Sequence, residues 1–301
     1  MIGFGKREKK KEPKKRVKEK KKAEAMEPQY LRSISNIQTL NYRVYYMSRN
    51  EKILYTLLFM LAGMAVGYIV FGGMAKDEYG NSTIMTYALD AVFMLISGLV
   101  AVKIFIPVRT QQLLEKRKET LKLQFRDFLE DLSTSLSTGK NTDNAFLSAE
   151  EDLKNQYEEG AFIVNEIKTI NAGLRNGAIA EELIEDFANR SGCQEIKDFS
   201  NTFSVGYRKG TDIRDVVRKT NEILSDKMSV KQDIETMVTG SKMELNLMLL
   251  MPIGMIAMMK SMSPDFAANF ATPTGMISML IAIACCGAAY LMGKRILDFK
   301  I

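Results

Sequence analysis

The stretch SLSTGKNTDNAF, residues 135–146, is the part of this chain that most resembles a phosphate-binding loop. A Walker A loop has the pattern G-x-x-x-x-G-K-[ST], because its glycines let backbone N–H groups wrap the phosphates and its hydroxyl holds magnesium. Here Thr134 stands where the first glycine belongs, and Asn141 stands where Ser or Thr belongs. The loop should also follow a strand, whereas a helical pattern precedes it. We therefore interpret Gly139-Lys140 as a helix-to-helix turn that binds no nucleotide.

The remaining residues offer little catalytic chemistry. The chain contains no His, which removes the usual general base and the most frequent metal ligand. Its three cysteines form no C-x-x-C pair, and Cys285 and Cys286 lie in an apolar run, so neither a disulfide framework nor a zinc site is expected. Carboxylates are numerous, but they fall on the polar faces of amphipathic helices. These observations favour a protein that is not an enzyme and that uses no cofactor and no metal.

Apolar runs predict four membrane-spanning helices. The second run contains Asp90 near one end and Lys103 near the other, and the third is short at its apolar centre. The runs are residues 53–73, 84–108, 245–259 and 274–293.

Positive charge indicates how these spans are oriented. The N-terminal arm, the segment 109–117 and Lys294-Arg295 are basic, and they fall on one side of a four-span layout. The loops on the other side, MAKDEYGNST and SMSPDFAANFATP, contain one Lys between them. By the positive-inside rule the arm, the long middle region and both ends of the chain are cytoplasmic. We therefore expect a multi-pass protein of the cytoplasmic (plasma) membrane.

The N-terminal arm is almost solid positive charge from Lys6 to Lys22. A block of like charge repels itself and buries no core, so residues 1–26 are expected to be disordered. Such an arm suits nucleic acid or an anionic membrane surface, and the spans that follow favour the membrane. The candidate contacts with anionic lipids are Lys14, Lys15, Arg16 and Lys18.

The segment between the arm and the first span, residues 27–52, mixes apolar and basic residues. Its apolar spacing suits a helix that lies in the membrane interface. A plain juxtamembrane linker is the alternative interpretation.

The middle region, residues 109–243, reads as helical throughout. Leu121, Phe125, Leu129 and Leu132 belong to one apolar helix face, and similar faces recur around Ile167 and in later segments. Four glycines separate the segments, and basic residues precede three of them, as is typical of helix C-termini with a left-handed glycine. These glycines are Gly139, Gly177, Gly192 and Gly210.

The last helix of this region is expected to begin near Thr211 and to continue without a breaker into the third span. A helix start follows directly after Gly139, Gly177 and Gly210, a pattern that indicates a weak internal repeat. The alternative is that helical hairpins commonly show the same pattern.

Three segments resemble the type II secretion system F domain. They are FRDFLEDLSTSLSTGKNTDNAF at its opening, LRNGAIAEELIEDFANRSGCQEIKDFSNTF in its middle and GYRKGTDIRDVVRKTNEIL at its end. The tail from Ser261, with Ser-Pro, Thr-Pro, a last span and a basic stub, is similar to TadB-type members. Residues 120–301 carry the resemblance, and the basic arm has no counterpart. Members of the general-secretion and type IV pilus systems usually carry two such domains, whereas this chain has one, which favours the tight-adherence (Tad) type.

The resemblance implies an all-α, multi-pass membrane protein with four transmembrane helices and a cytoplasmic F-type helical bundle between the two pairs. The expected parts are a disordered basic arm (1–26), a juxtamembrane segment (27–52), transmembrane helices 1 and 2 (53–108), the F-type domain (109–243), transmembrane helices 3 and 4 (244–293) and a cytoplasmic tail (294–301).

The resemblance further implies an inner-membrane platform protein of a Tad-type pilus or type II secretion machine. The implied partners are a hexameric secretion ATPase, which performs the hydrolysis, a TadC-like F-domain paralogue, pilin subunits and membrane lipids, in a homo- or hetero-oligomer without nucleic acid. Cations beside the glycine turns are the candidate contacts with the motor or another partner: Lys140, Arg175, Arg208 and Lys209.

Two alternatives remain open at this point. A TadC-type paralogue shares the layout of a TadB-type protein. A membrane transporter or channel would use Asp90 or Lys103, because charges within the membrane are costly and often functional. Against this, Asp90 lies near the outer end of its span and Lys103 can extend to the inner surface.

Overall fold

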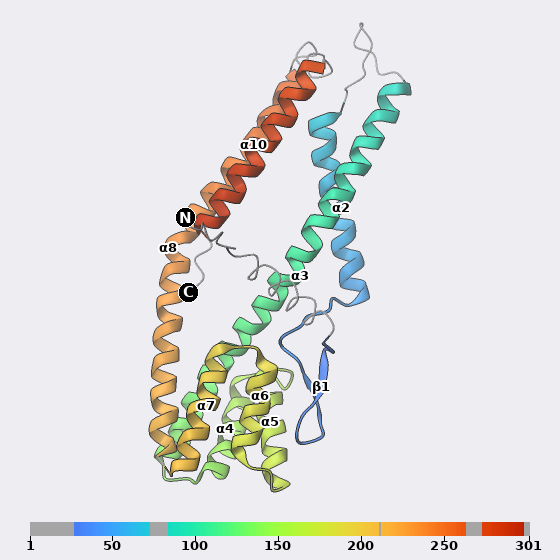
Figure 1. Ribbon diagram of the computed structural model, residues 1–301. Helices are drawn as coiled ribbons and strands as arrows, with labels where there is room; N and C mark the ends of the chain where they lie inside the picture. Colours follow the sequence, from blue (N-terminus) through green and yellow to red (C-terminus); the bar gives the residue numbers. More distant parts are fainter. Residues whose placement is uncertain (1–26, 73–83, 211, 263–272, 298–301) are drawn as a thin grey trace, which may run out of the picture. The chain divides into compact units, whose positions relative to one another are not determined.

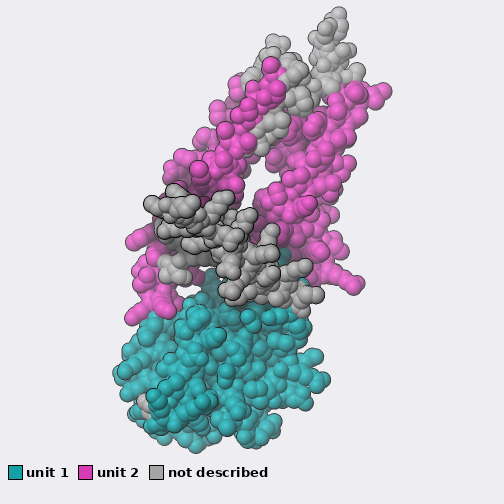
Figure 2. Space-filling model, in the orientation of Figure 1, with its two compact units in different colours: residues 1–46, 110–225 teal, residues 47–109, 226–301 magenta. Residues whose placement is uncertain are grey.

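The computed structural model describes residues 27–72, 84–210, 212–262 and 273–297 (Figure 1). The basic arm with its lipid-contact candidates Lys14, Lys15, Arg16 and Lys18 lies outside the described residues. The chain divides into two compact units (Figure 2). Unit 1 comprises residues 1–46 and 110–225, and unit 2 comprises residues 47–109 and 226–301.

Unit 1 is a helical bundle. Its helices are the second part of α3 (Ile84–Ser137), α4 (Thr142–Gln156), α5 (Phe162–Arg175), α6 (Ala180–Ser191), α7 (Gln194–Lys209) and the first part of α8 (Ile213–Met262). Helices α4 to α7 follow one another as neighbours along the bundle (Figure 1).

An aromatic cluster fills the centre of the bundle. Phe125 of α3 contacts Phe187 of α6 and Phe199 of α7, with ring centroids 6.1 and 5.5 Å apart. Phe146 of α4 and Phe203 of α7 extend the cluster, and these side chains are buried. The apolar face predicted for residues 121–136 is therefore confirmed as the core face of α3, because burial of such a stripe drives helix association.

The predicted glycine turns are confirmed by their backbone angles. The φ values are +83° at Gly139, +81° at Gly177, +60° at Gly192 and +64° at Gly210. Gly192 and Gly210 are the left-handed C-caps of α6 and α7. A side chain in this conformation clashes with the neighbouring carbonyl, which is why glycine ends these helices.

Residues 30–40 contain no helix, so the interfacial-helix interpretation of this segment is wrong. Strand β1 (Tyr30–Arg32) pairs antiparallel with β2 (Gln38–Leu40), and Tyr30 faces Leu40 in the register. The turn between the strands contains Asn36 at φ 58°. The apolar residues at 34 and 37, whose spacing suggested a helix, are exposed in this hairpin.

Unit 2 contains α2 (Arg49–Phe71), the first part of α3, the later part of α8 and α10 (Pro273–Leu297). A capping box begins α2, since Ser48 and Glu51 each accept a hydrogen bond from the other residue's backbone N–H. Small residues let α2 and α3 approach closely: Ser97 Oγ donates to the carbonyl oxygen of Gly63 at 2.7 Å. Such contacts are typical of helices that associate in lipid.

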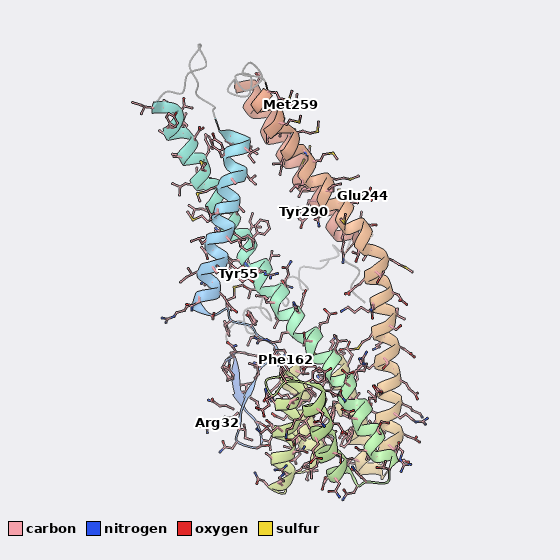
Figure 3. The ribbon with its side chains drawn as sticks, turned by 180° about the vertical axis from the view of Figure 1, so that it is seen from behind. Arg32, Tyr55, Phe162, Glu244, Met259 and Tyr290 are labelled. Atoms are coloured by element: carbon pink, nitrogen blue, oxygen red, sulfur yellow. The ribbon has the colours of Figure 1, made fainter. Side chains whose placement is uncertain are left out.

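Three of the described helices are long and apolar enough to cross a membrane: α2, α3 and α8. Within α8 the apolar part lies between Glu244 and Met259, which Figure 3 labels. Helix α10 contains a shorter apolar stretch, Ala284–Gly293. Three spans are thus supported, and the fourth stays a prediction.

The prediction of one long final helix is confirmed. Helix α8 has 50 residues, begins at Ile213 and continues through Ser229 and Gly240, with Pro252 in its apolar part. Helix α3 has 54 residues and likewise contributes to both units.

Candidate functional site

The order of the helices brings the predicted partner-contact cations to one end of unit 1. Neighbouring helices alternate in direction, so the turns at Gly139, Gly177 and Gly210 share this end. Lys140 lies in the first of these turns, Arg175 ends α5, and Arg208 and Lys209 end α7. All four residues are exposed. We call them the turn-end cations.

Two of the turn-end cations are tied to neighbouring side chains. Arg208 forms an ion pair with Glu181 of α6 at 2.6 Å, although the arginine side chain is 74% exposed. This contact lowers the pKa of Glu181 and raises the pKa of Arg208. Lys140 donates to Ser148 Oγ at 2.5 Å. These contacts fix the cations on the surface without neutralising the whole group.

Arg175 acts on a carboxylate of α4. Burial works to raise the pKa of Glu150, but hydrogen bonds from Lys154 and Asn171, together with the charge of Arg175, outweigh it and lower that pKa. Lys154 donates to Glu150 at 2.6 Å, and Asn171 donates at 2.7 Å. Glu150 therefore stays ionised and serves as an internal counter-ion between α4 and α5.

The loop at Gly139 lacks the context of a phosphate-binding loop. The 54-residue helix α3 precedes it, and α4 follows with Asn141 as its N-cap, whose side chain accepts from the N–H of Asn144. The first-turn N–H groups that a phosphate would need are thus partly satisfied by the chain itself. Within the described ranges there is also no group of three or more His, Cys, Asp or Glu side chains placed to hold a metal ion.

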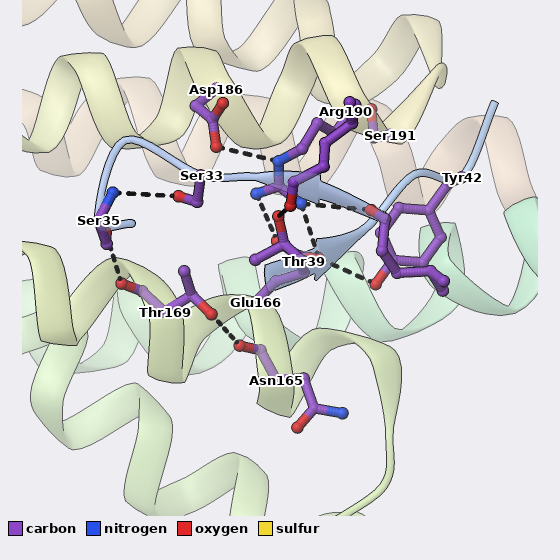
Figure 4. Close-up of polar contacts among 12 residues, drawn as sticks. Ser33, Ser35, Thr39, Tyr42, Asn165, Glu166, Thr169, Asp186, Arg190 and Ser191 are labelled. Atoms are coloured by element: carbon purple, nitrogen blue, oxygen red, sulfur yellow. Dashed lines mark hydrogen bonds and ion pairs between the residues drawn. The ribbon is translucent and has the colours of Figure 1, made fainter. Parts of the chain in front are cut away.

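A buried polar network joins the β1–β2 segment to the bundle (Figure 4). Arg190 of α6 makes two parallel hydrogen bonds to Glu166 of α5, at 3.0 and 2.8 Å. Its Nε donates to Asp186 at 2.9 Å. Tyr42 donates its hydroxyl proton to the same glutamate at 3.1 Å, and its backbone N–H donates to the carbonyl oxygen of Arg190 at 3.0 Å.

Burial sets the electrostatics of this network. It raises the pKa of Glu166, and the hydrogen bonds and charge of Arg190 offset this rise only in part. Burial and the adjacent glutamate also raise the pKa of Tyr42 well above its ordinary value. The arginine and glutamate side chains are only 4% and 3% exposed. With both charged side chains almost fully buried, we interpret the network as one that fixes residues 27–46 on α5 and α6.

This network was not predicted from the sequence. Arg190 is the basic residue before Gly192, which was interpreted as a cation at a helix C-terminus, and Glu166 had no predicted role. A signal was present, because both charged residues lie three positions after a core residue, Ile163 or Phe187, and therefore on a buried helix face.

The charges considered for a transporter lie on α3 within unit 2. Asp90 is half-buried and Lys103 is exposed. The cavity described below contains neither residue.

The described residues define a class of protein: a helical bundle attached to membrane-spanning helices by two long, continuous helices. Residues 128–259 match the family model of the type II secretion system (T2SS), protein F. The match begins inside α3 and ends in the apolar part of α8, and it supports the type II secretion system F family. Comparison with curated proteins and with solved structures gives no match.

Proposed function

We propose that this protein is an inner-membrane platform component of a type IV-like (Tad) pilus or type II secretion machine. It couples a cytoplasmic motor ATPase to the insertion of pilin subunits into a filament. The family match over residues 128–259 carries this proposal, because proteins of that family form the membrane platform of such machines. Four membrane spans, with both chain ends in the cytoplasm, belong to the same proposal.

The two long helices supply a physical basis for coupling. Both α3 and α8 contain residues of the bundle core and, in another part of the same helix, the apolar residues of a span. Helix α3 contains Pro107 close to the division between the two units, whereas the proline of α8, Pro252, lies within its apolar part. The turns of α8 before Pro252 are held by their own backbone hydrogen bonds, which makes this stretch stiff. A displacement of the bundle is therefore passed chiefly along α8 to the membrane segments.

The turn-end cations are the proposed contact with the motor or with another cytoplasmic partner. Their exposure lets acidic residues of a partner reach them, and their place on three separate turns spreads them over one end of the bundle. Charged contacts of this kind chiefly set specificity and the rate of association. Reversing two of the charges should therefore weaken the complex without unfolding the bundle.

The test is purification of the tagged full-length protein from native membranes. We expect a hexameric secretion ATPase and an F-domain paralogue to co-purify, and the paralogue distinguishes a TadB-type from a TadC-type role. The variant Lys140→Glu with Lys209→Glu should lose most of the ATPase. Lys168→Glu, an exposed lysine in the middle of α5, is the matched control and should retain it. Recovery of neither ATPase nor paralogue with the unaltered protein would overturn the proposal.

A further inference from the structure

A second basic site lies in unit 1, away from the turn-end cations. A cavity of about 340 Å³ is lined by residues of the segment before α2 and of three helices, α3, α6 and α7. This volume falls in the range of small-molecule pockets, roughly 300–1,000 Å³. The lining residues are Arg43, Leu114, Lys118, Ala188, Asn189, Gly192, Cys193, Gln194 and Lys197.

The charge of this cavity is one-sided. Three of its lining residues are cations, Arg43, Lys118 and Lys197, and none is an acid. Arg43 has a loose ion pair with Glu27 at 3.7 Å. Neither lysine forms an ion pair with any residue that the structure describes. The cavity therefore has two cations, Lys118 and Lys197, without an acidic partner among the described residues, and an anion that enters it is attracted to them.

Gly192 leaves space for the side chains of Arg43 and Lys118 beside its backbone. A Cβ atom at this position would lie 2.8 Å from Arg43 Cγ and 3.1 Å from Lys118 Nζ. Its φ of +60° also belongs to the left-handed region. The glycine thus ends α6 and at the same time lets the arginine and lysine side chains cross its backbone closely.

The start of α7 supplies a second kind of anion ligand. Cys193 and Gln194 line the cavity and are the N-cap and first residue of α7. No side chain caps this helix start, as is also true of α5 and α6, whereas Asn141 caps α4. The Gln194 side chain donates along its own helix, to Asp198 at 2.8 Å. Free N–H groups at a helix N-terminus bind phosphate well, since they point outward with the positive end of the helix dipole.

We propose that this cavity binds a phosphate group. The chemistry fits the phosphate of an anionic phospholipid head group or a small free phosphate anion. The lipid source is compatible with the sequence, because Lys118 follows Val108, the predicted end of the second span, by ten residues. The cavity itself belongs to unit 1, and only the lipid source rests on the predicted span.

The experiment uses the full-length protein in a neutral detergent, with two probes. Inorganic phosphate is titrated by calorimetry, and phosphatidylglycerol binding is counted by native mass spectrometry. We expect Lys118→Gln with Lys197→Gln to weaken binding of at least one probe roughly tenfold, because each lost cation removes an attraction at short range. Binding to the unaltered protein should also weaken as salt is added.

Lys116→Gln is the matched control, because this exposed lysine also lies on α3 but does not line the cavity. It should leave both affinities within about twofold of the unaltered protein. Loss of phosphate binding in the double variant identifies a free anion as ligand, and loss of lipid binding alone identifies a head group. If neither probe binds, or if the double variant and Lys116→Gln bind alike, the proposal is wrong.

Discussion

Single residues decide how the bundle holds the β1–β2 segment, and a substitution of Arg190 tests this most directly. Its buried guanidinium group donates hydrogen bonds to Glu166, to Asp186 and to the carbonyl oxygen of Leu40. A buried ion pair adds little net stability compared with apolar residues of similar size. Removal of one partner, however, leaves the other charge buried with neither a counter-ion nor water to solvate it. The effect of a substitution therefore depends on whether a charge is left behind.

We predict that Arg190→Ala destabilises the protein by about 3–5 kcal/mol, because Glu166 stays buried without its partner. Arg190→Met combined with Glu166→Leu should recover much of this loss, since no buried charge remains. Thermal melting followed by circular dichroism in neutral detergent measures both variants. Arg208→Ala, at the exposed ion pair with Glu181, is the control and should change the melting temperature little. Equal melting of the two alanine variants would contradict the predicted role of the network.

Asp131 on α3 gives a prediction about pH. Burial raises its pKa to about 6, and the nearby carboxylates of Asp152, Glu130 and Asp127 add to this, although Gln156 donates two hydrogen bonds to it and acts in the opposite direction. Because the folded state binds the proton more tightly than the unfolded chain, this group favours folding below about pH 4. That contribution is lost as the pH rises toward 6.

Asp131→Asn should remove this pH dependence, while its amide oxygen still accepts from Gln156. The melting temperature of the variant, measured relative to the unaltered protein, should therefore increase from pH 4 to just above 6 and then stay level. Melting curves at several pH values within this window provide the check. A difference that is constant across the window would mean that the carboxyl group of Asp131 titrates normally in the folded protein.

At the scale of helices and strands, local signals were sufficient for some elements and not for others. Two kinds of feature could be predicted: the glycine turns, such as those at Gly177 and Gly192, and the core face of α3. Both depend on residues within one or two helical turns of each other, so a short window of sequence contains the whole signal. The β1–β2 segment could not be predicted in this way. Its position depends on Tyr42 meeting Glu166 and Arg190, which are far from it in the chain, and three-residue strands carry almost no periodicity of their own.

Helix α8 is the element on which mechanical coupling depends. Val230 lies in its middle and is 52% exposed, so its side chain contributes little to the core. Proline at this position removes a backbone hydrogen bond and kinks the helix, at a local cost of about 3 kcal/mol or more. We predict that Val230→Pro inserts into the membrane and still contacts the ATPase but does not assemble a filament.

The matched control is Val230→Ala, which keeps the helix intact. Both variants are compared for expression, for ATPase co-purification and for filaments on the cell surface. If the proline variant assembles filaments as well as the alanine variant, force does not pass along α8.

At the scale of the whole molecule, apolar runs predicted four membrane helices, because a span depends on composition over a length that the bilayer sets. Three described helices meet this criterion. The candidate partner site was predictable only in part. The turn-end cations followed from the glycine turns, whereas the phosphate cavity combines residues from the segment before α2 and from three helices, and no window of the sequence contains it.

The arrangement of the spans can be tested directly in cells. From the positive-inside rule we expect the arm, the bundle and the tail to be cytoplasmic and the two loops between paired spans to face outward. Single cysteines are introduced at Ser82 and Ala268, which lie outside the described residues, and at Lys140 in the bundle, in a background without the three native cysteines. A membrane-impermeant thiol reagent should label the first two sites in intact cells and should reach Lys140→Cys only after the membrane is broken. Labelling of Lys140→Cys in intact cells would mean that the topology is inverted and that the proposed motor contact does not face the cytoplasm, where ATP is found. Labelling at position 82 but not at position 268 would mean that only the first pair of helices spans the membrane.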